Sequence, residues 1–222
     1  MITFYIDTTS KYLYTGLVKD NELLNEKKLC LSTNLSVFTV DEVSKMFLEV
    51  NLKPSDIDKI IVVNGPGSFT GIRIGVTLAK IYAFCLNKKI ITITSLEAMK
   101  ESINSNKLIV PILNARRNAC YAAIYDGDEK IMEEKYLSID ALKLFLLGLN
   151  KDYIFVSNDE FDFSCEKYDP DILKIVLKYQ ERKEINPHLV NPLYLKLTEA
   201  EENKKKEEWN DWGVKNWRYW YN

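Results

Sequence analysis

The feature that most constrains this chain is a glycine-rich segment that leads from an apolar strand into an apolar helix. Four of the eight glycines fall between residues 65 and 75, just after the β-branched run Ile60–Val63. The helix predicted to follow, ending near Leu86, carries only two charged residues, Arg73 and Lys80. A helix that is apolar nearly all round has to be covered nearly all round. The pattern therefore predicts a buried helix in an α/β protein.

Small residues recur at every fourth position of this predicted helix and form a stripe of minimal side chains. Glycine inside a helix costs about 0.8–1.0 kcal/mol relative to alanine, so close packing is the expected compensation. A sheet can cover one side of the helix, and the stripe would let a second helix approach closely on the other. No segment obviously supplies that second layer, so we expect a subunit interface here, with packing inside the chain as the alternative. The predicted interface residues are Gly71, Ile72, Arg73, Gly75, Val76, Ala79 and Ala83.

The glycine spacing matches neither of two familiar phosphate-binding loops. A P-loop needs a glycine five positions after its first, and neither Gly65 nor Gly67 has one. The dinucleotide fingerprint fails because Thr70 occupies its third glycine position. Two interpretations stay open: an anion site at the start of the helix, or a tight strand-to-helix turn capped by Ser68.

The order of predicted elements indicates two related α/β lobes, each beginning with a hairpin and continuing through a strand and a helix. Strands are predicted near residues 2–6, 11–18, 22–31, 60–63, 90–93, 108–113, 121–125, 131–136 and 153–156, with helices near 37–50, 96–103, 139–147 and 172–178 besides the glycine-started one. We expect an N-terminal lobe over residues 1–104, a C-terminal lobe over 105–200 and a charged tail over 201–222. All four tryptophans lie in the last fourteen residues, so this tail either docks its aromatic end on the body or serves as an interaction arm.

Composition argues against several classes of protein. Thirty Lys and Arg against thirty-two Asp and Glu disfavour a non-specific polyanion binder. The chain has no run of 18 apolar residues and no signal-peptide pattern, so we expect a cytoplasmic protein with no membrane contact. The four cysteines, Cys30, Cys85, Cys120 and Cys165, lie far apart and are expected to be reduced and partly buried. With His188 as the only histidine, expected in a loop, we predict no metal site and no catalytic residue.

The segment 65–75, Gly-Pro-Gly-Ser-Phe-Thr-Gly-Ile-Arg-Ile-Gly, resembles the hallmark of the TsaB (YeaZ) family, a subunit of the bacterial tRNA threonylcarbamoyladenosine machinery. Supporting segments are Ile6–Ser10, Thr94–Ala98, Ala115–Arg117 and Pro192–Lys196. The resemblance implies an actin-like (ASKHA) fold with two related lobes, whose mixed sheets are flanked by helices. It also implies a non-catalytic platform without a cofactor, which pairs with the catalytic subunit TsaD through helices that include the glycine-started one. TsaE is then a further subunit, tRNA is reached through the complex, and the chain alone forms a homodimer.

The same resemblance raises an alternative function, an actin-like ATPase or kinase-type enzyme. In actin-like nucleotide enzymes an Asp at the end of the first strand positions a metal or water near the phosphates, and Asp7 stands in the equivalent place. The following residues offer hydroxyls but no glycine, so phosphate could approach less closely. Asp7, Thr8 and Ser10 are therefore candidates for a degenerate nucleotide site. A peptidase, suggested by the old glycoprotease label of the wider family, is disfavoured because histidine ligands are missing.

Two departures from the family pattern remove ionisable groups and weaken any acid–base role. Leu35 lies between Asn34 and Ser36 where the family often has His-Ser, and Asn114 stands where an Asp often precedes Ala-Arg. Arg116 and Arg117 are candidates for direct contact with tRNA, the alternative being solvated or salt-bridged arginines.

Overall fold

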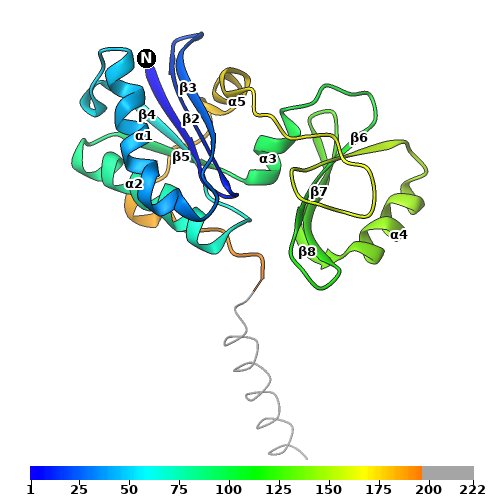
Figure 1. Ribbon diagram of the computed structural model, residues 1–222. Helices are drawn as coiled ribbons and strands as arrows, with labels where there is room; N and C mark the ends of the chain where they lie inside the picture. The colour runs from blue at the N-terminus through cyan, green and yellow to red at the C-terminus, as the bar shows by residue number, and fades with distance from the viewer. Residues whose placement is uncertain (197–222) are drawn as a thin grey trace, which may run out of the picture.

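The computed structural model describes residues 1–196 and shows two lobes side by side, each built on one mixed β-sheet (Figure 1). The first sheet has the strand order β3-β2-β1-β4-β5. Its strands are β1 (Ile2–Asp7), β2 (Tyr12–Lys19), β3 (Glu22–Cys30), β4 (Lys59–Val63) and β5 (Lys89–Ile93). The first three strands form an antiparallel meander, whereas β1, β4 and β5 are parallel to one another. Parallel neighbours need crossover connections, and helices supply them here.

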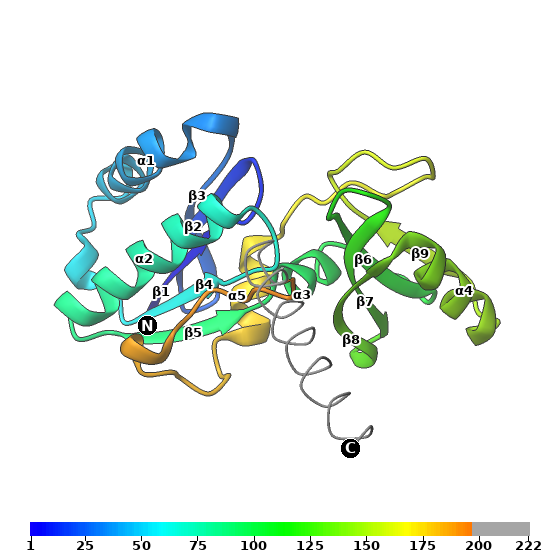
Figure 2. The same ribbon diagram turned by 90° about the horizontal axis from the view of Figure 1, so that it is seen from below.

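Helices cover both faces of the first sheet, because its central strands are apolar on both sides. On one face lie α1 (Leu35–Glu49) and α2 (Phe69–Cys85), which pack over side chains such as Phe4 and Ile60 (Figure 2). The opposite face, with Tyr5 and Ile61, is covered by α3 (Ser95–Lys100) and α5 (Ile172–Tyr179). Short 3₁₀ turns lie at Ser32–Asn34, Pro54–Asp56 and Pro187–Leu189.

The second sheet has the order β8-β7-β6-β9 and is smaller. Its strands are β6 (Leu108–Asn114), β7 (Ala119–Asp126), β8 (Glu129–Ser138) and β9 (Tyr153–Val156). The helix α4 (Ile139–Leu149) joins β8 to β9 and buries Leu142 and Leu146 against the sheet. The predicted α/β class with two lobes is confirmed, since helices flank the mixed sheet of each lobe.

The chain does not stay in the second lobe up to residue 200. The two sheets divide between Ile93 and Leu108, around the expected boundary, but α5 packs against β1, β2 and β3. Val190 also belongs to the apolar core beneath α1 and α2. The expected C-terminal lobe over 105–200 is therefore wrong at its end, because the amphipathic α5 covers a face of the first sheet. The predicted Trp-rich tail over 201–222 lies outside the described residues.

Residues 1–196 include all four cysteines and the single histidine of the chain. All four cysteines are free; Cys30 and Cys85 are exposed, Cys165 is half-buried and Cys120 is buried. His188, expected in a loop, lies in the short 3₁₀ turn Pro187–Leu189, with its ring edge-on to Phe84. None of the helices described there is long and apolar enough to cross a bilayer.

Candidate functional site

The glycine-rich segment brings the start of α2 against the turn that follows β1. Ser68 caps α2, because its Oγ accepts a hydrogen bond from Gly71 N at 3.3 Å. The Ser68 N–H donates in turn to the Thr9 carbonyl at 2.6 Å. A Cβ on Gly67 would lie 2.2 Å from that same carbonyl oxygen, so only glycine allows this approach. The capped strand-to-helix turn expected from the sequence is thus present.

The glycines inside α2 serve the same close contact one and two turns further along the helix. A Cβ on Gly71 would lie 2.0 Å from the Thr8 carbonyl oxygen, and a Cβ on Gly75 would lie 2.5 Å from Thr8 Oγ1. Thr8 is fully buried, and its hydroxyl donates to the Gly71 carbonyl at 2.7 Å. The two glycines of the small-residue stripe therefore pack against a turn of their own chain.

Most of the predicted interface residues are buried inside the first lobe. These are Gly71, Ile72, Gly75, Val76, Ala79 and Ala83. These residues are covered by the first sheet, by the turn at Thr8 and by helix α1, since α2 contacts both β4 and α1. The inference that a second subunit must cover the stripe is wrong, and the alternative of packing within the chain is what the structure shows. Arg73 is the one residue of the predicted set that is exposed.

The outward side of α1 and α2 exposes large apolar side chains. The two helices lie next to each other on one face of the first sheet (Figures 1 and 2). We call this surface the α1/α2 face; its exposed apolar residues are Val37, Phe38, Val40 and Leu48 on α1 with Ile81 and Phe84 on α2. Leu48 is 72% exposed and Phe84 is 64% exposed. Scattered surface leucines are ordinary, but a group of this size on adjacent helices is typical of a protein interface.

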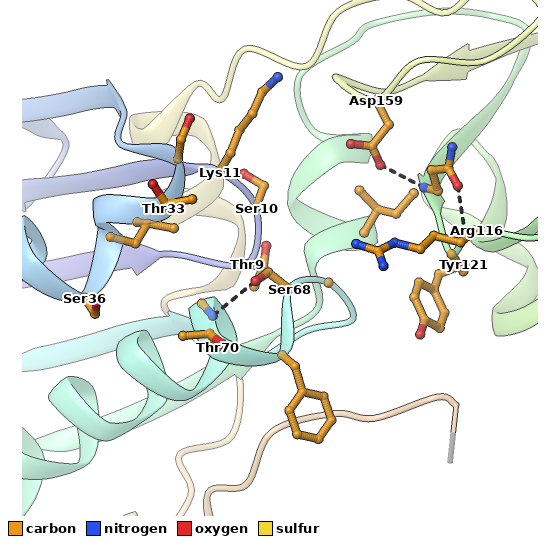
Figure 3. Close-up of a pocket in the computed structure, with 18 residues that line it drawn as sticks. Thr9, Ser10, Lys11, Thr33, Ser36, Ser68, Thr70, Arg116, Tyr121 and Asp159 are labelled. Carbon is orange, nitrogen blue, oxygen red and sulfur yellow. Dashed lines mark hydrogen bonds between the residues drawn. The ribbon is translucent and has the colours of Figure 1, made fainter. Parts of the chain in front are cut away.

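A cleft of about 890 Å³ opens between the two lobes (Figure 3). The first lobe contributes the turn after β1 and the starts of α1 and α2, and the second contributes the end of β6 and the loop after it. Hydroxyl groups dominate the first-lobe wall: Thr9, Ser10, Ser32, Thr33, Ser36, Ser68 and Thr70. Two cations, Lys11 and Arg116, also line the cleft. Such a lining offers donors for phosphate and ribose oxygens.

Asp7 lies beneath the cleft and does not line it. The carboxylate is 2% exposed, and its Oδ1 accepts hydrogen bonds from Thr9 N at 2.8 Å and from Thr9 Oγ1 at 2.7 Å. Burial raises its pKa to about 6, although the two hydrogen bonds from Thr9 act in the opposite direction. Of the three candidate nucleotide-site residues, Thr8 is buried against α2 and only Ser10 faces the cleft. Asp7 therefore shapes the turn that forms the cleft floor.

A left-handed turn presents Arg116 to the cleft from the second lobe. Arg116, Arg117 and Asn118 have φ values of 63°, 53° and 56°, a conformation that costs energy for bulky residues. Asn114, one of the departures from the family pattern, supports this turn because its Oδ1 accepts from Arg116 N at 2.8 Å. Its own N–H donates to Asp159 Oδ2 at 2.8 Å. Asp159 was not a sequence candidate, since only the fold brings it beside β6.

Aromatic rings flank the cleft on both lobes. The ring of Phe69 stacks on Tyr194 with centroids 4.3 Å apart, and the Arg73 guanidinium carbon lies 4.2 Å from the Phe69 centroid. Arg73 Nε also donates to Tyr194 Oη at 2.9 Å. On the second lobe, Tyr121 and Tyr136 are partners across β7 and β8, with centroids 5.7 Å apart. The sequence analysis does not predict this arrangement of rings. The available signal was that Tyr194 lies in the family-like segment Pro192–Lys196, two positions before Lys196.

Comparisons with known proteins agree with the fold and the glycine segment. The family model described as "TsaD: tRNA N6-adenosine threonylcarbamoyltransferase" matches residues 31–165. A Bacillus subtilis protein named tRNA threonylcarbamoyladenosine biosynthesis protein TsaB is 30% identical over 221 residues, which cover 90% of this chain and 96% of that relative. The chain belongs to the TsaB family. A TsaB protein from Buchnera aphidicola is 22% identical, over 85% of this chain and 95% of its own length.

Solved structures of the TsaB (YeaZ) family share the fold of the chain. A Pseudomonas aeruginosa protein described as similar to peptidase YEAZ superposes with a TM-score of 0.74 at 14% identity, covering 88% of this chain and 99% of its own. A structure described as YeaZ from the same organism gives a TM-score of 0.70 at 13% identity, covering 87% and 100%. The family resemblance stated from the glycine segment is thus confirmed.

Proposed function

We propose that this TsaB-family chain acts in tRNA threonylcarbamoyladenosine biosynthesis as a non-catalytic platform subunit in the cytoplasm. It binds and activates the catalytic subunit TsaD through the α1/α2 face, with TsaE as a further subunit and no cofactor of its own. The names of its curated relatives support the pathway. The resemblance of the glycine-started helix to the family hallmark supports the use of α2 in the partnership.

The α1/α2 face is the observation that carries this proposal. Six large apolar side chains are exposed on two helices that already pack against each other. Burial of apolar surface releases about 25 cal/mol per Å², so a partner that covers this face gains affinity from it. Helix α4 of the second lobe also exposes apolar residues, Leu144, Phe145 and Leu147. That group is smaller and lies on one helix, so we assign TsaD to the α1/α2 face.

In the absence of TsaD, the same face pairs two copies of the chain, because it stays exposed in the monomer. The alternative of an actin-like ATPase that uses Asp7 gains no support from the geometry. The Asp7 carboxylate is buried, and Thr9 occupies one of its oxygens with two hydrogen bonds.

Two leucines with equal exposure allow a matched test of the interface. Leu48 on α1 and Leu144 on α4 are both 72% exposed, and both lie within helices. We expect Leu48→Asp to weaken binding to the cognate TsaD by about 30-fold or more, as for a central interface residue, and Leu144→Asp to leave it unchanged. Phe84→Asp should behave like Leu48→Asp. Isothermal titration calorimetry measures the affinities, and circular dichroism checks that each variant is folded.

The opposite ranking would place the partner on α4 of the second lobe. Wild-type affinity in both Leu48→Asp and Phe84→Asp would refute the assignment of TsaD to the α1/α2 face.

A further inference from the structure

We propose that the mouth of the interlobe cleft binds single-stranded RNA directly, with bases stacked on its exposed aromatic rings and phosphates held by its cations. We define the cleft mouth by Phe69, Arg73 and Tyr194 on the first lobe, Arg116, Tyr121 and Tyr136 on the second, and Lys196 where the described chain ends. The choice of RNA rests on the proposed function, in which tRNA is the substrate of the complex.

The aromatic rings of the cleft mouth are open to solvent on both lobes. Phe69 is 40% exposed, Tyr194 39% and Tyr136 37%. Stacking on such rings is how proteins recognise unpaired bases, because every base has a π-face and a duplex hides it. Two aromatic pairs on opposite sides of one cleft suit a strand that runs across the opening.

Within residues 1–196, no carboxylate neutralises the cations of the cleft mouth, and Arg73 donates only to the hydroxyl of Tyr194. Arg73, Arg116 and Lys196, together with Lys11 in the cleft, have no carboxylate partner within residues 1–196. Elsewhere the lobes use many of their cations internally, as in the 2.8 Å pair between Lys100 and Asp128. Arg73 and Lys196 instead lie over aromatic rings, an arrangement that combines stacking with positive charge.

Among the described residues, Asp159 is the one carboxylate that lines the cleft, and it leaves this positive character in place. Asp159 already accepts a hydrogen bond from the backbone of Asn114. The hydroxyl-rich wall behind the aromatic rings adds donors and acceptors that suit ribose 2′-OH groups. A free nucleotide would use the cleft interior, whereas the exposed rings lie on its rim; an extended strand uses both.

Fluorescence anisotropy with a labelled RNA hairpin that has a single-stranded loop tests this proposal, using the full chain. Tyr136→Ala should weaken binding about tenfold or more, because it removes one stacking platform. The matched control is Tyr153→Ala, since Tyr153 is also 37% exposed but lies on β9. Its affinity should equal that of the wild type.

Salt dependence supplies a second, independent readout. Arg116→Ala should reduce the slope of log affinity against log salt by about 0.7, the value for one phosphate contact on a single strand. Lys135→Ala is the control, because Lys135 is exposed on the same strand as Tyr136 but points to the other face of the sheet. Its slope should not change.

Several outcomes would overturn the proposal: no binding of the hairpin by the wild type, equal affinity of the Tyr136 and Tyr153 variants, or equal affinity for a fully paired duplex. Displacement of the RNA by ATP with magnesium would reassign the cleft to a nucleotide. The proposed platform role is tested separately, since Leu48→Asp should lose TsaD and keep RNA, whereas Tyr136→Ala should keep TsaD. Loss of RNA binding alone would leave the platform role standing.

Discussion

The substitution Gly71→Ala distinguishes two explanations of the glycine stripe. The stripe could form an interface between subunits, or it could pack against a turn of the same chain. In the structure, an added Cβ would lie 2.0 Å from the Thr8 carbonyl oxygen, a distance at which something must move. The obstructing atom belongs to the backbone of Thr8, the residue that directly follows β1, the central strand of the first sheet. The substitution should therefore destabilise the monomer itself.

The magnitude follows from three contributions. Overpacking of a filled site costs about 1–3 kcal/mol, and disturbing the 2.7 Å bond from Thr8 Oγ1 to the Gly71 carbonyl costs about 1 kcal/mol more. The better helix propensity of alanine offsets about 1 kcal/mol. The free energy of unfolding should thus fall by about 1–3 kcal/mol. Gly148→Ala in α4 is the control, because nothing lies within 4 Å of its added Cβ, and it should gain about 0.5–1 kcal/mol.

Thermal unfolding at a low protein concentration, followed by circular dichroism, measures both changes. For a chain of this size, 1 kcal/mol shifts the midpoint by about 2–4 °C. A decrease for Gly71→Ala and an increase for Gly148→Ala is the expected pair. If Gly71→Ala were as stable as the wild type and lost only its association with TsaD, the intrachain explanation would be refuted.

Two further predictions concern buried carboxylates, with urea unfolding as the measurement. Burial raises the pKa of Asp7 to about 6, so between about pH 4 and pH 6 the folded chain holds a proton that the unfolded chain has released, and stability falls as pH rises. Asp7→Asn should remove about 2–3 kcal/mol of this pH-dependent loss, and an unchanged pH profile would contradict it. Arg182→Met should cost about 1–2 kcal/mol, because the Arg182 guanidinium donates to both oxygens of the buried Glu97 at 2.9 and 3.0 Å. The neighbouring exposed Lys183→Met is its control, and equal stability of the two variants would contradict the prediction.

The order of strands and helices could be predicted because it depends on local patterns. The apolar run before the glycine segment, the cap at Ser68 and the helical spacing after it are all short-range signals. What covers α2 could not be predicted, since Thr8 and Gly71 are 63 positions apart and a stripe of small residues fits a turn as well as a helix. The return of α5 to the first sheet was missed for the same reason: its amphipathic pattern shows that it is covered, but not by which sheet.

In the interlobe cleft, too, local sequence patterns predict some features, whereas others depend on long-range contacts. Asp7 was located correctly at the end of the first strand, but its burial depends on packing that the sequence does not state. The stack of Phe69, Arg73 and Tyr194 depends on a long-range contact, because Arg73 and Tyr194 are 121 positions apart. A basic residue near an aromatic one is common in any chain, so the pairing needed the fold.

Helix α2 contributes both to the proposed TsaD interface and to the proposed RNA site. The inner side of α2 packs against the turn at Thr8, and this turn forms the floor of the cleft. The outer side of α2 exposes Ile81 and Phe84 to a partner. Phe69, at the start of the helix, stands at the cleft mouth, and Phe84 lies fifteen residues further on. At 1.5 Å per residue that distance is about 22 Å, less than the width of a small domain. A partner seated on the α1/α2 face would therefore lie beside RNA held at the cleft mouth, and substitutions on the inner side of α2 should affect folding while those on the outer side affect assembly.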